Sequence, residues 1–324
     1  MGRVHRSALV GGAGTALLLS GLLGAQTSTA VVPPGEGPGP HRIAAVPTSE
    51  VTTPPADPPP AELPGGGRVL FPGRRLVALY GHPGAPSLGV LGEQGIAATI
   101  DRARRVARPY RALSKVPVVP SFEIIATVAH GSAGSDGDYS GESSVRSLRP
   151  WVEAAGRNGM FVLLDLQPGR ADLLDQARRY EALLVLPHVG LAVDPEWKLG
   201  PHQLPLGQIG SIDAAEINRT SSWLAMLVRR ENLPQKLFVV HQFRLSMIGR
   251  EHLLQADLPE LALLVHMDGQ GGAAQKLATW RSVRAARPAG APLGWKNFYD
   301  EDHPTFSPEQ TMTRRPRPLM ISYQ

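Results

Sequence analysis

After Arg68, short apolar runs of strand length alternate with longer segments in which apolar residues recur at helical spacing. Strands that alternate with helices are joined by crossovers and form a parallel sheet, so the pattern predicts an α/β fold. The expected helices span residues 96–113, 145–158, 171–184, 214–231 and 273–286. The eight expected strands span residues 76–80, 119–127, 160–165, 189–194, 237–242, 261–266, 293–298 and 319–323. Eight repeats are the number found in a single (β/α)8 TIM-type barrel.

An open, doubly wound sheet is the main alternative to the barrel. It is disfavoured because Gly81-His82-Pro83-Gly84, after the first expected strand, lacks the glycine spacing of a dinucleotide-binding loop. The crossovers after the strands at 237–242 and 293–298 show weak helical patterns and are expected to be short or irregular. The clearest helix start is Asp213, whose side chain is expected to cap the helix while Glu216 reaches back to the Asp213 amide.

The first 67 residues differ in composition from the rest of the chain. Residues 1–30 combine a basic start, an apolar stretch and small residues near Ala30, which predicts a secretory signal peptide. A retained N-terminal anchor is the alternative. Residues 31–67 are rich in Pro and Gly and predict a disordered linker, and residues 68–324 form the expected barrel domain. The chain is therefore expected to be secreted or associated with the cell envelope.

Composition excludes several classes of function. The chain has no cysteine, which removes disulfides, zinc-thiolate sites and cysteine nucleophiles. The net charge of +5 is distributed over scattered arginines and not over basic runs, so nucleic acid is not an expected partner. The mature chain is expected to be a monomer without a membrane span, to need no cofactor or bound metal, and to act on a carbohydrate ligand.

The stretch from Val189 to Trp197 has the strongest functional signal. It is an apolar strand that ends in Asp194, Pro195, Glu196 and Trp197, and the alternation of side chains along a strand puts Asp194 and Glu196 on one face. In a barrel, the carboxyl ends of the strands meet at one mouth, where the active site lies. The other expected strands also have polar or aromatic carboxyl ends. The expected substrate-binding residues there are Tyr80, His82, Glu123, Gln167, Trp197, His241, Gln242, His266, Trp295, Asn297, Tyr299 and Tyr323.

Paired carboxylates beside aromatic residues are typical of glycoside hydrolysis. Glu196, next to Trp197, is the expected general acid, and Asp194 is expected to stay ionised and to orient Glu196 or the substrate. Asp165 and Asp268 are the candidates for the second catalytic carboxylate. Glu123 falls in the middle of its strand, where a carboxylate must be paired, protonated or hydrated. The alternation of side chains does not decide between His241 and Gln242, or between Trp295 and Lys296.

At Asp194 and Glu196 the chain resembles barrel glycoside hydrolases of the chitinase type. Their fourth strand ends in D-x-x-D-x-D-x-E. In that family the final Glu is the acid and the preceding Asp orients the acetamido group of the substrate. The last two acids of the motif match Asp194 and Glu196, whereas Val189 and Ala192 stand where the motif has its first two. More broadly, the chain is similar to secreted barrel proteins of GC-rich bacteria, a likeness that implies no activity.

Two other functions remain open. A barrel that binds glycans or belongs to the cell envelope would use the same aromatic residues without catalysis. A metal-dependent hydrolase is the second alternative, with His241, His266 and Asp268 as ligands. In the second case the chain is similar to amidohydrolase barrels only in the order of its histidines.

Overall fold

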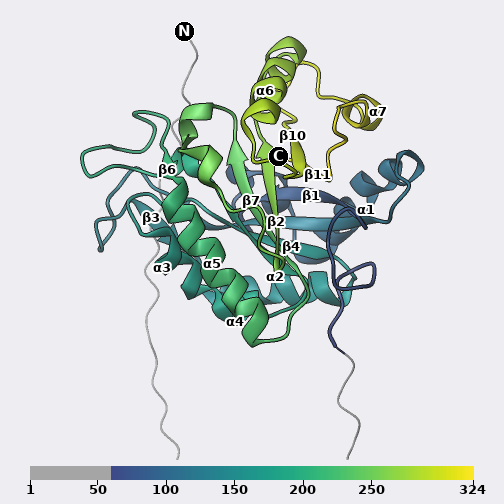
Figure 1. Ribbon diagram of the computed structural model, residues 1–324, viewed down its shortest axis with the longest axis horizontal. Helices are drawn as coiled ribbons and strands as arrows, with labels where there is room; N and C mark the ends of the chain where they lie inside the picture. The colour runs from purple at the N-terminus through teal and green to yellow at the C-terminus, as the bar shows by residue number, and fades with distance from the viewer. Residues whose placement is uncertain (1–59) are drawn as a thin grey trace, which may run out of the picture. The chain divides into compact units, whose positions relative to one another are not determined.

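Eight parallel strands close into a barrel whose helices lie on the outside (Figure 1). The computed structural model of the protein describes residues 60–324. The expected signal peptide, and the expected linker as far as residue 59, lie outside these residues. The barrel strands are β1 (Arg75–Gly81), β2 (Val118–Ala129), β4 (Phe161–Leu166), β5 (Val189–Val193), β7 (Lys236–Gln242), β9 (Leu261–Met267), β10 (Leu293–Asn297) and β11 (Met320–Tyr323). Pairing of β1 with both β2 and β11 closes the ring. The predicted TIM-type barrel is therefore confirmed.

Helices cover the barrel in the order in which they follow the strands. They are α1 (Ile96–Leu113), α2 (Val145–Arg157), α3 (Leu173–Arg179), α4 (Glu181–Leu184), α5 (Ala214–Arg230), α6 (Ala273–Ala286) and α7 (Pro308–Met312). The predicted helix at 171–184 is divided into α3 and α4. No helix within residues 60–324 has both the length and the apolar character needed to cross a bilayer.

Irregular elements fill the connections at the mouth and on the outside. The crossovers that the sequence predicted to be irregular contain only short elements: η4, β8 and η5 after β7, and α7 after β10. Two small strand pairings were not predicted from the sequence: β3 pairs antiparallel with the end of β2, and β6 pairs with β8. These elements are β3 (Ser140–Glu142), β6 (Ile212–Asp213), β8 (Ile248–Gly249), η1 (Pro86–Leu88), η2 (Val90–Glu93), η3 (Pro195–Trp197), η4 (Leu245–Met247) and η5 (Glu251–Leu253).

The start of α5 agrees with the sequence at one residue and differs at another. Asp213 caps the helix, because its carboxylate accepts a hydrogen bond from the Ala215 amide at 2.9 Å. Glu216 does not complete the predicted capping box. Its carboxylate instead accepts from the Leu173 amide at 3.0 Å and from Lys198 Nζ at 2.6 Å. The reason is that a charged partner, Lys198 of the loop after β5, lies within reach.

Alternate residues of each strand point to opposite faces of the sheet and so belong to two different apolar cores. Val189, Leu191 and Val193 of β5 face outward and pack in the core under the helices. Ala192 faces the barrel axis, in a second core made of small and branched residues. The members of this inner core that lie on strands are Leu76, Ala78, Val119, Phe161, Leu163, Ala192, Leu237, Val239, Leu264 and Met320.

The segment before β1 closes the amino-terminal end of the barrel. Leu63 and Leu70 are buried in the inner core, with 3% and 0% of their surface exposed. The Leu70 amide donates to Gln235 Oε1 at 2.9 Å, which ties the segment to the residue before β7. Residues 60–67, which the sequence assigned to a linker, are thus part of the folded unit. The interior is apolar at this end and polar at the other.

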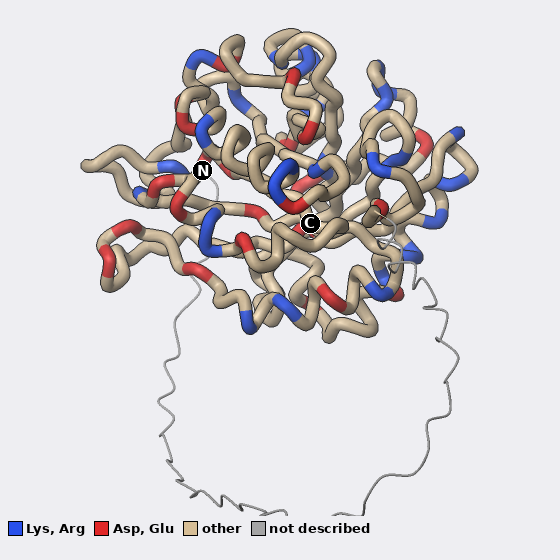
Figure 2. The backbone as a smooth tube through the Cα atoms, turned by 60° about the horizontal axis from the view of Figure 1, so that its bottom comes forward, with Lys and Arg blue, Asp and Glu red and all other residues tan. Residues whose placement is uncertain are grey.

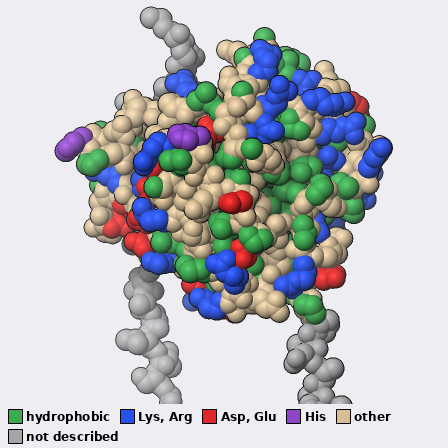
Figure 3. Space-filling view, viewed as in Figure 1, with side chains coloured by type: hydrophobic (Ala, Val, Ile, Leu, Met, Phe, Trp, Pro, Cys, Tyr) green, Lys and Arg blue, Asp and Glu red, His purple; other side chains and the backbone are tan. Residues whose placement is uncertain are grey.

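Lys and Arg residues are interspersed with Asp and Glu residues along much of the chain (Figure 2). Lys and Arg side chains gather over α6 and α7 in the view of Figure 3. Arg281, Arg284, Arg315 and Arg317 are exposed in this part of the chain, and none forms an ion pair with a carboxylate in residues 60–324. The fold thus brings together arginines that are scattered in the sequence.

Candidate functional site

The carboxyl ends of the barrel strands open onto a cavity of about 640 Å³. Carboxylates, amides and aromatic rings line it together. They include Tyr80, Gln167, Asp194, Glu196, Trp197, Phe243, Asp268 and Phe298, and the ammonium group of Lys296 lines the cavity with them. A larger hollow of about 840 Å³ lies between α1 and α2, but Glu153 is the one acidic residue that lines it. The barrel mouth is therefore the candidate site.

The acid pair predicted from the sequence forms, although by a different local geometry. β5 ends at Val193, and Glu196 lies in the short helix η3 and not on an extended strand. The turn still directs Glu196 inward. Carboxylate oxygens of Asp194, Glu196 and Asp268 all lie within 4.8 Å of one another. Asp268 follows β9, so the chain reversal at η3 and the end of β9 bring three acids to one point.

His241 lies below this acid cluster and links two carboxylates. Its Nε2 is 2.9 Å from Glu123 Oε1, and its Nδ1 is 3.2 Å from Asp268 Oδ2. Burial alone would lower the pKa of His241, but Glu123, Asp268 and Asp165 together raise it well above its usual value. His241 is therefore protonated near neutral pH and donates one hydrogen bond to each of its two partners.

The three acids of the cluster differ in protonation because their neighbours differ. Burial acts to raise the pKa of Asp268, but the hydrogen bond and positive charge of His241, together with Lys296, lower it below the usual value. Burial and the nearby Asp268 raise the pKa of Glu196 to about 7. Burial and Glu196 raise the pKa of Asp194 well above its ordinary value. This raised pKa goes against the expectation that Asp194 stays ionised, because burial and the charges of Glu196 and Asp165 outweigh the positive charge of His241.

A second polar group lies beside His241 in the barrel. The Tyr80 hydroxyl donates to Asp165 Oδ2 at 2.9 Å, and Lys296 Nζ lies 3.5 Å from the centre of the Tyr80 ring. Burial and the charge of Glu123 raise the pKa of Asp165 to about 6, against the opposing charge of His241. Asp165 is fully buried below the cavity. Of the two candidates for the second catalytic carboxylate, Asp268 is thus the one that reaches the cavity.

His266 forms a separate contact on the neighbouring strands. Its Nε2 lies 2.7 Å from Ser322 Oγ. The other ring edge lies against Gly294 so closely that a Cβ at position 294 would be 1.9 Å from His266 Nδ1. Burial and the positive charge of His241 lower the pKa of His266 well below its usual value. His266 is neutral and supports the cavity floor from below.

A metal site on His241, His266 and Asp268 is not supported by this geometry. Both ring nitrogens of His241 are engaged with carboxylates, and His266 lies against Ser322 and Gly294. Within residues 60–324, the side chains close enough to share an ion are Asp194, Glu196 and Asp268, and an exposed or half-buried group of Asp136, Asp138 and Glu142. Oxygen ligands of this kind suit Ca²⁺ or Mg²⁺.

The predicted substrate-binding residues lie in three places. Tyr80, Gln167 and Trp197 line the cavity, and Glu123, His241 and His266 are buried beneath it. The others lie away from it: His82 contacts Ser143, Gln242 donates to Glu251, Trp295 donates to Asn297, and Tyr299 stacks on Tyr323.

Lys296 is a cavity residue that the sequence prediction did not select. It lines the cavity, whereas Trp295 packs outside the barrel in a cluster with Trp280 and Phe306. The period of two along β10 gave either residue as the inward one, and the structure decides for Lys296. The signal that could have found it is Gly294, because a glycine two residues earlier leaves room inside the barrel for a neighbour such as His266.

Comparisons with known proteins assign no family to this chain. No protein-family model matches the chain, and no curated protein matches it. The proposed function therefore rests on the fold and on the geometry of the site.

Proposed function

We propose that the protein is a glycoside hydrolase in which Glu196 is the general acid and Asp268 is the ionised catalytic partner. One observation carries the proposal: two carboxyl groups at one cavity, with oxygens within 4.8 Å, have pKa values shifted in opposite directions. Environments that separate the pKa values of two neighbouring acids assign an acid and a base. Tyr80 and Trp197 at the same cavity supply aromatic surface for a sugar ring.

The proposed reaction breaks the bond between the anomeric carbon and the leaving oxygen. Glu196 gives its proton to that oxygen, while Asp268 attacks the anomeric carbon and forms a glycosyl ester. Water then releases the sugar, with Glu196 accepting the proton of the water and Asp268 leaving as a carboxylate. A short separation of about 5–5.5 Å between the two carboxyl groups is typical of retaining enzymes. Retention of the anomeric configuration is the expected outcome.

The similarity to chitinase-type barrels supports the same acid. Asp194 and Glu196 follow β5, the fourth strand of the barrel, as the last two acids of the chitinase motif do. We propose that Asp194, protonated in the free site, donates a hydrogen bond to the substrate or to Glu196. With residues 1–30 as a secretory signal, the substrate would be a glycan of the cell envelope or the surroundings.

The test is a screen of glycan hydrolysis with the wild type, Glu196→Gln and Asp268→Asn. Removal of an acid/base residue typically lowers the rate by about 10²–10⁴, and both variants are expected to lose activity on this scale. Glu153→Gln, a surface change on α2, is the matched control and should keep full activity. Glycan binding that survives Glu196→Gln, with no hydrolysis by the wild type, would instead indicate a non-catalytic glycan-binding barrel.

A further inference from the structure

Large apolar side chains are exposed on the loop that forms one side of the cavity. This loop, residues 198–211, joins η3 to β6. Leu204, Leu206 and Ile209 are 52%, 79% and 40% exposed. Single exposed apolar residues are common in proteins, but three in one short loop form a patch. Leu206 and Ile209 also line the cavity that contains Asp194 and Glu196. The patch is therefore continuous with the acidic site.

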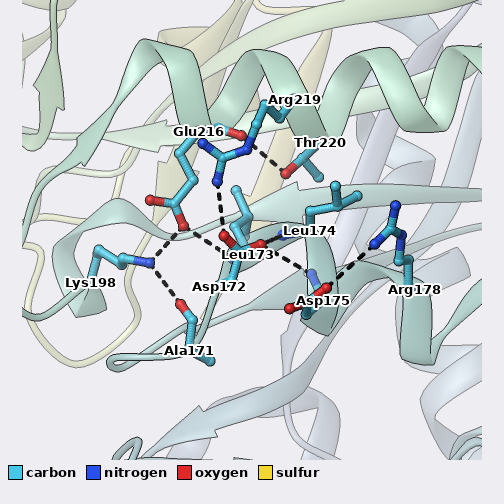
Figure 4. A network of polar contacts seen from close by, with 10 residues as sticks. All are labelled: Ala171, Asp172, Leu173, Leu174, Asp175, Arg178, Lys198, Glu216, Arg219 and Thr220. Carbon is cyan, nitrogen blue, oxygen red and sulfur yellow. Dashed lines mark hydrogen bonds and ion pairs between the residues drawn. The ribbon is translucent and has the colours of Figure 1, made fainter.

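Hydrogen bonds fix both ends of the loop at residues 198–211. The three apolar side chains are therefore exposed on a loop that is anchored to the barrel. Lys198 Nζ donates to Glu216 Oε1 at 2.6 Å and to the Ala171 carbonyl at 2.7 Å (Figure 4). The Gly210 amide donates to the Glu196 carbonyl at 2.7 Å, which closes the neck of the loop. Leu206 has a left-handed backbone with φ of 63°, a conformation that a branched side chain rarely adopts. The fold thus presents Leu206 at the rim and does not bury it.

The cavity has two chemically different parts. Its floor holds the acids and Lys296, which suit the hydroxyl groups of a sugar. Its rim has Leu206 and Ile209 on one side and half-buried Phe243 as a further apolar wall. A purely polar glycan gains little from such a rim, whereas an alkyl chain would bury it at a gain of roughly 25 cal/mol per Å².

We propose that the substrate is an amphipathic glycoside. Its sugar occupies the acidic floor, and its apolar aglycone, an alkyl or lipid chain, lies on Leu206, Ile209 and Phe243. This inference rests on the proposed function for the identity of the sugar site, but it concerns binding and can be tested without turnover.

The experiment measures binding of methyl and octyl glycosides of glucose, galactose, mannose and N-acetylglucosamine by calorimetry, below the micelle concentration. Glu196→Gln protein is used so that no ligand is hydrolysed. For each sugar that binds, the octyl glycoside is expected to bind at least about tenfold more tightly than the methyl glycoside. The double change Leu206→Ser and Ile209→Ser should reduce this ratio to near one.

Leu253→Ser is the matched control, because Leu253 is 50% exposed and is not among the residues that line the cavity. It should keep the full ratio. An octyl preference that survives the double change, binding of octanol as tight as that of the glycosides, or no binding by any member of the set would overturn the inference. Tight octyl glycoside binding by a wild type that hydrolyses nothing would uphold it and reject only the hydrolase proposal.

Discussion

Glu196 is held beside like charges, and its proton therefore affects both rate and stability. Because its pKa is raised to about 7 and that of Asp268 is lowered, the acid and the anion coexist below neutral pH. We expect kcat/KM to fall as pH rises through about 7, as Glu196 loses its proton. On the acid side, activity should persist until Asp268 is protonated, below the usual carboxyl range. A pH profile on any hydrolysed glycoside checks this, and a rate that rises above pH 8 would contradict it.

The same residue should destabilise the fold at neutral pH. Its pKa is 4.5 in the unfolded chain and about 7 in the folded protein, so between these values the folded state holds more protons. Stability contributed by this group is therefore lost as pH rises from about 4.5 to 7. Glu196→Gln is expected to be more stable than the wild type at pH 8 and no more stable at pH 4. Urea unfolding at both pH values measures this, and an equal shift at both would contradict it.

Which residues face the cavity was only partly predictable from the sequence. The period of two fixes which residues share a face, as for Asp165 and Gln167, but not which face is inside. On β10 both faces carry a large residue, Trp295 or Lys296, so only the closed ring decides. The pKa of Asp194 was equally hidden, because it depends on the distance to Glu196 and not on spacing along the chain.

At the scale of elements, one buried ion pair attaches α6 to the end of β10. Lys276 Nζ donates to Asp302 Oδ2 at 2.6 Å and to the Lys296 carbonyl at 2.7 Å, and neither side chain of the ion pair is exposed. Loss of one partner leaves an uncompensated buried charge, which typically costs about 3–5 kcal/mol. Asp302→Ala is therefore expected to lower the free energy of unfolding by this amount.

Chemical denaturation measures that loss, and a double-mutant cycle gives its control. Replacing both partners with apolar residues, as Lys276→Met with Asp302→Leu, should restore part of the stability, because no charge remains buried. The rest is not regained, because the amides of Gly271 and Phe298 lose the Asp302 carboxylate as their acceptor. A double variant as unstable as the single one would show that the pair contributes through its fit and not through its charge.

Regular elements were predictable where local pattern and final packing agree. The strands at 237–242 and 261–266 and the helices at 96–113 and 273–286 lie where the sequence placed them, within a residue or so. Glu196 is an exception, because Pro195 begins a helical turn where alternation alone extends the strand. The pairing of β3 with β2 also escaped prediction, since its three residues carry no alternation.

At the scale of the whole molecule, the barrel depends on a segment outside its repeats. Leu63 is 3% exposed within the inner core, and removing a buried leucine side chain costs about 2–5 kcal/mol. A chain that begins at residue 60 should therefore be more stable by about this amount than one that begins at Arg68. Urea unfolding of the two truncated chains, with Leu63→Ala in the longer one, checks the prediction. Equal stability would mean that Leu63 does not contribute to the closed end.

The barrel as a whole was predictable because eight strand–helix repeats without a dinucleotide-binding glycine loop favour a closed barrel over an open sheet, whichever residues line the ring. The closed end was not predictable, because Leu63 lies among Pro and Gly, a composition that indicates no core. Leu63 becomes a core residue only because the folded strands leave an apolar space at the amino-terminal end of the barrel, and its sequence neighbours do not show that space.

The contact between His266 and Gly294 restricts which sequence changes related chains can accept. Any side chain at position 294 would occupy the space of the His266 ring, so the two positions are not free to vary independently. Lys296, two residues further on, reaches the cavity from the same face of β10. Related chains that keep the site should therefore inherit the histidine, the glycine and the lysine together. A lineage that replaces the glycine should have replaced the histidine first, and these paired changes would mark where the site was lost.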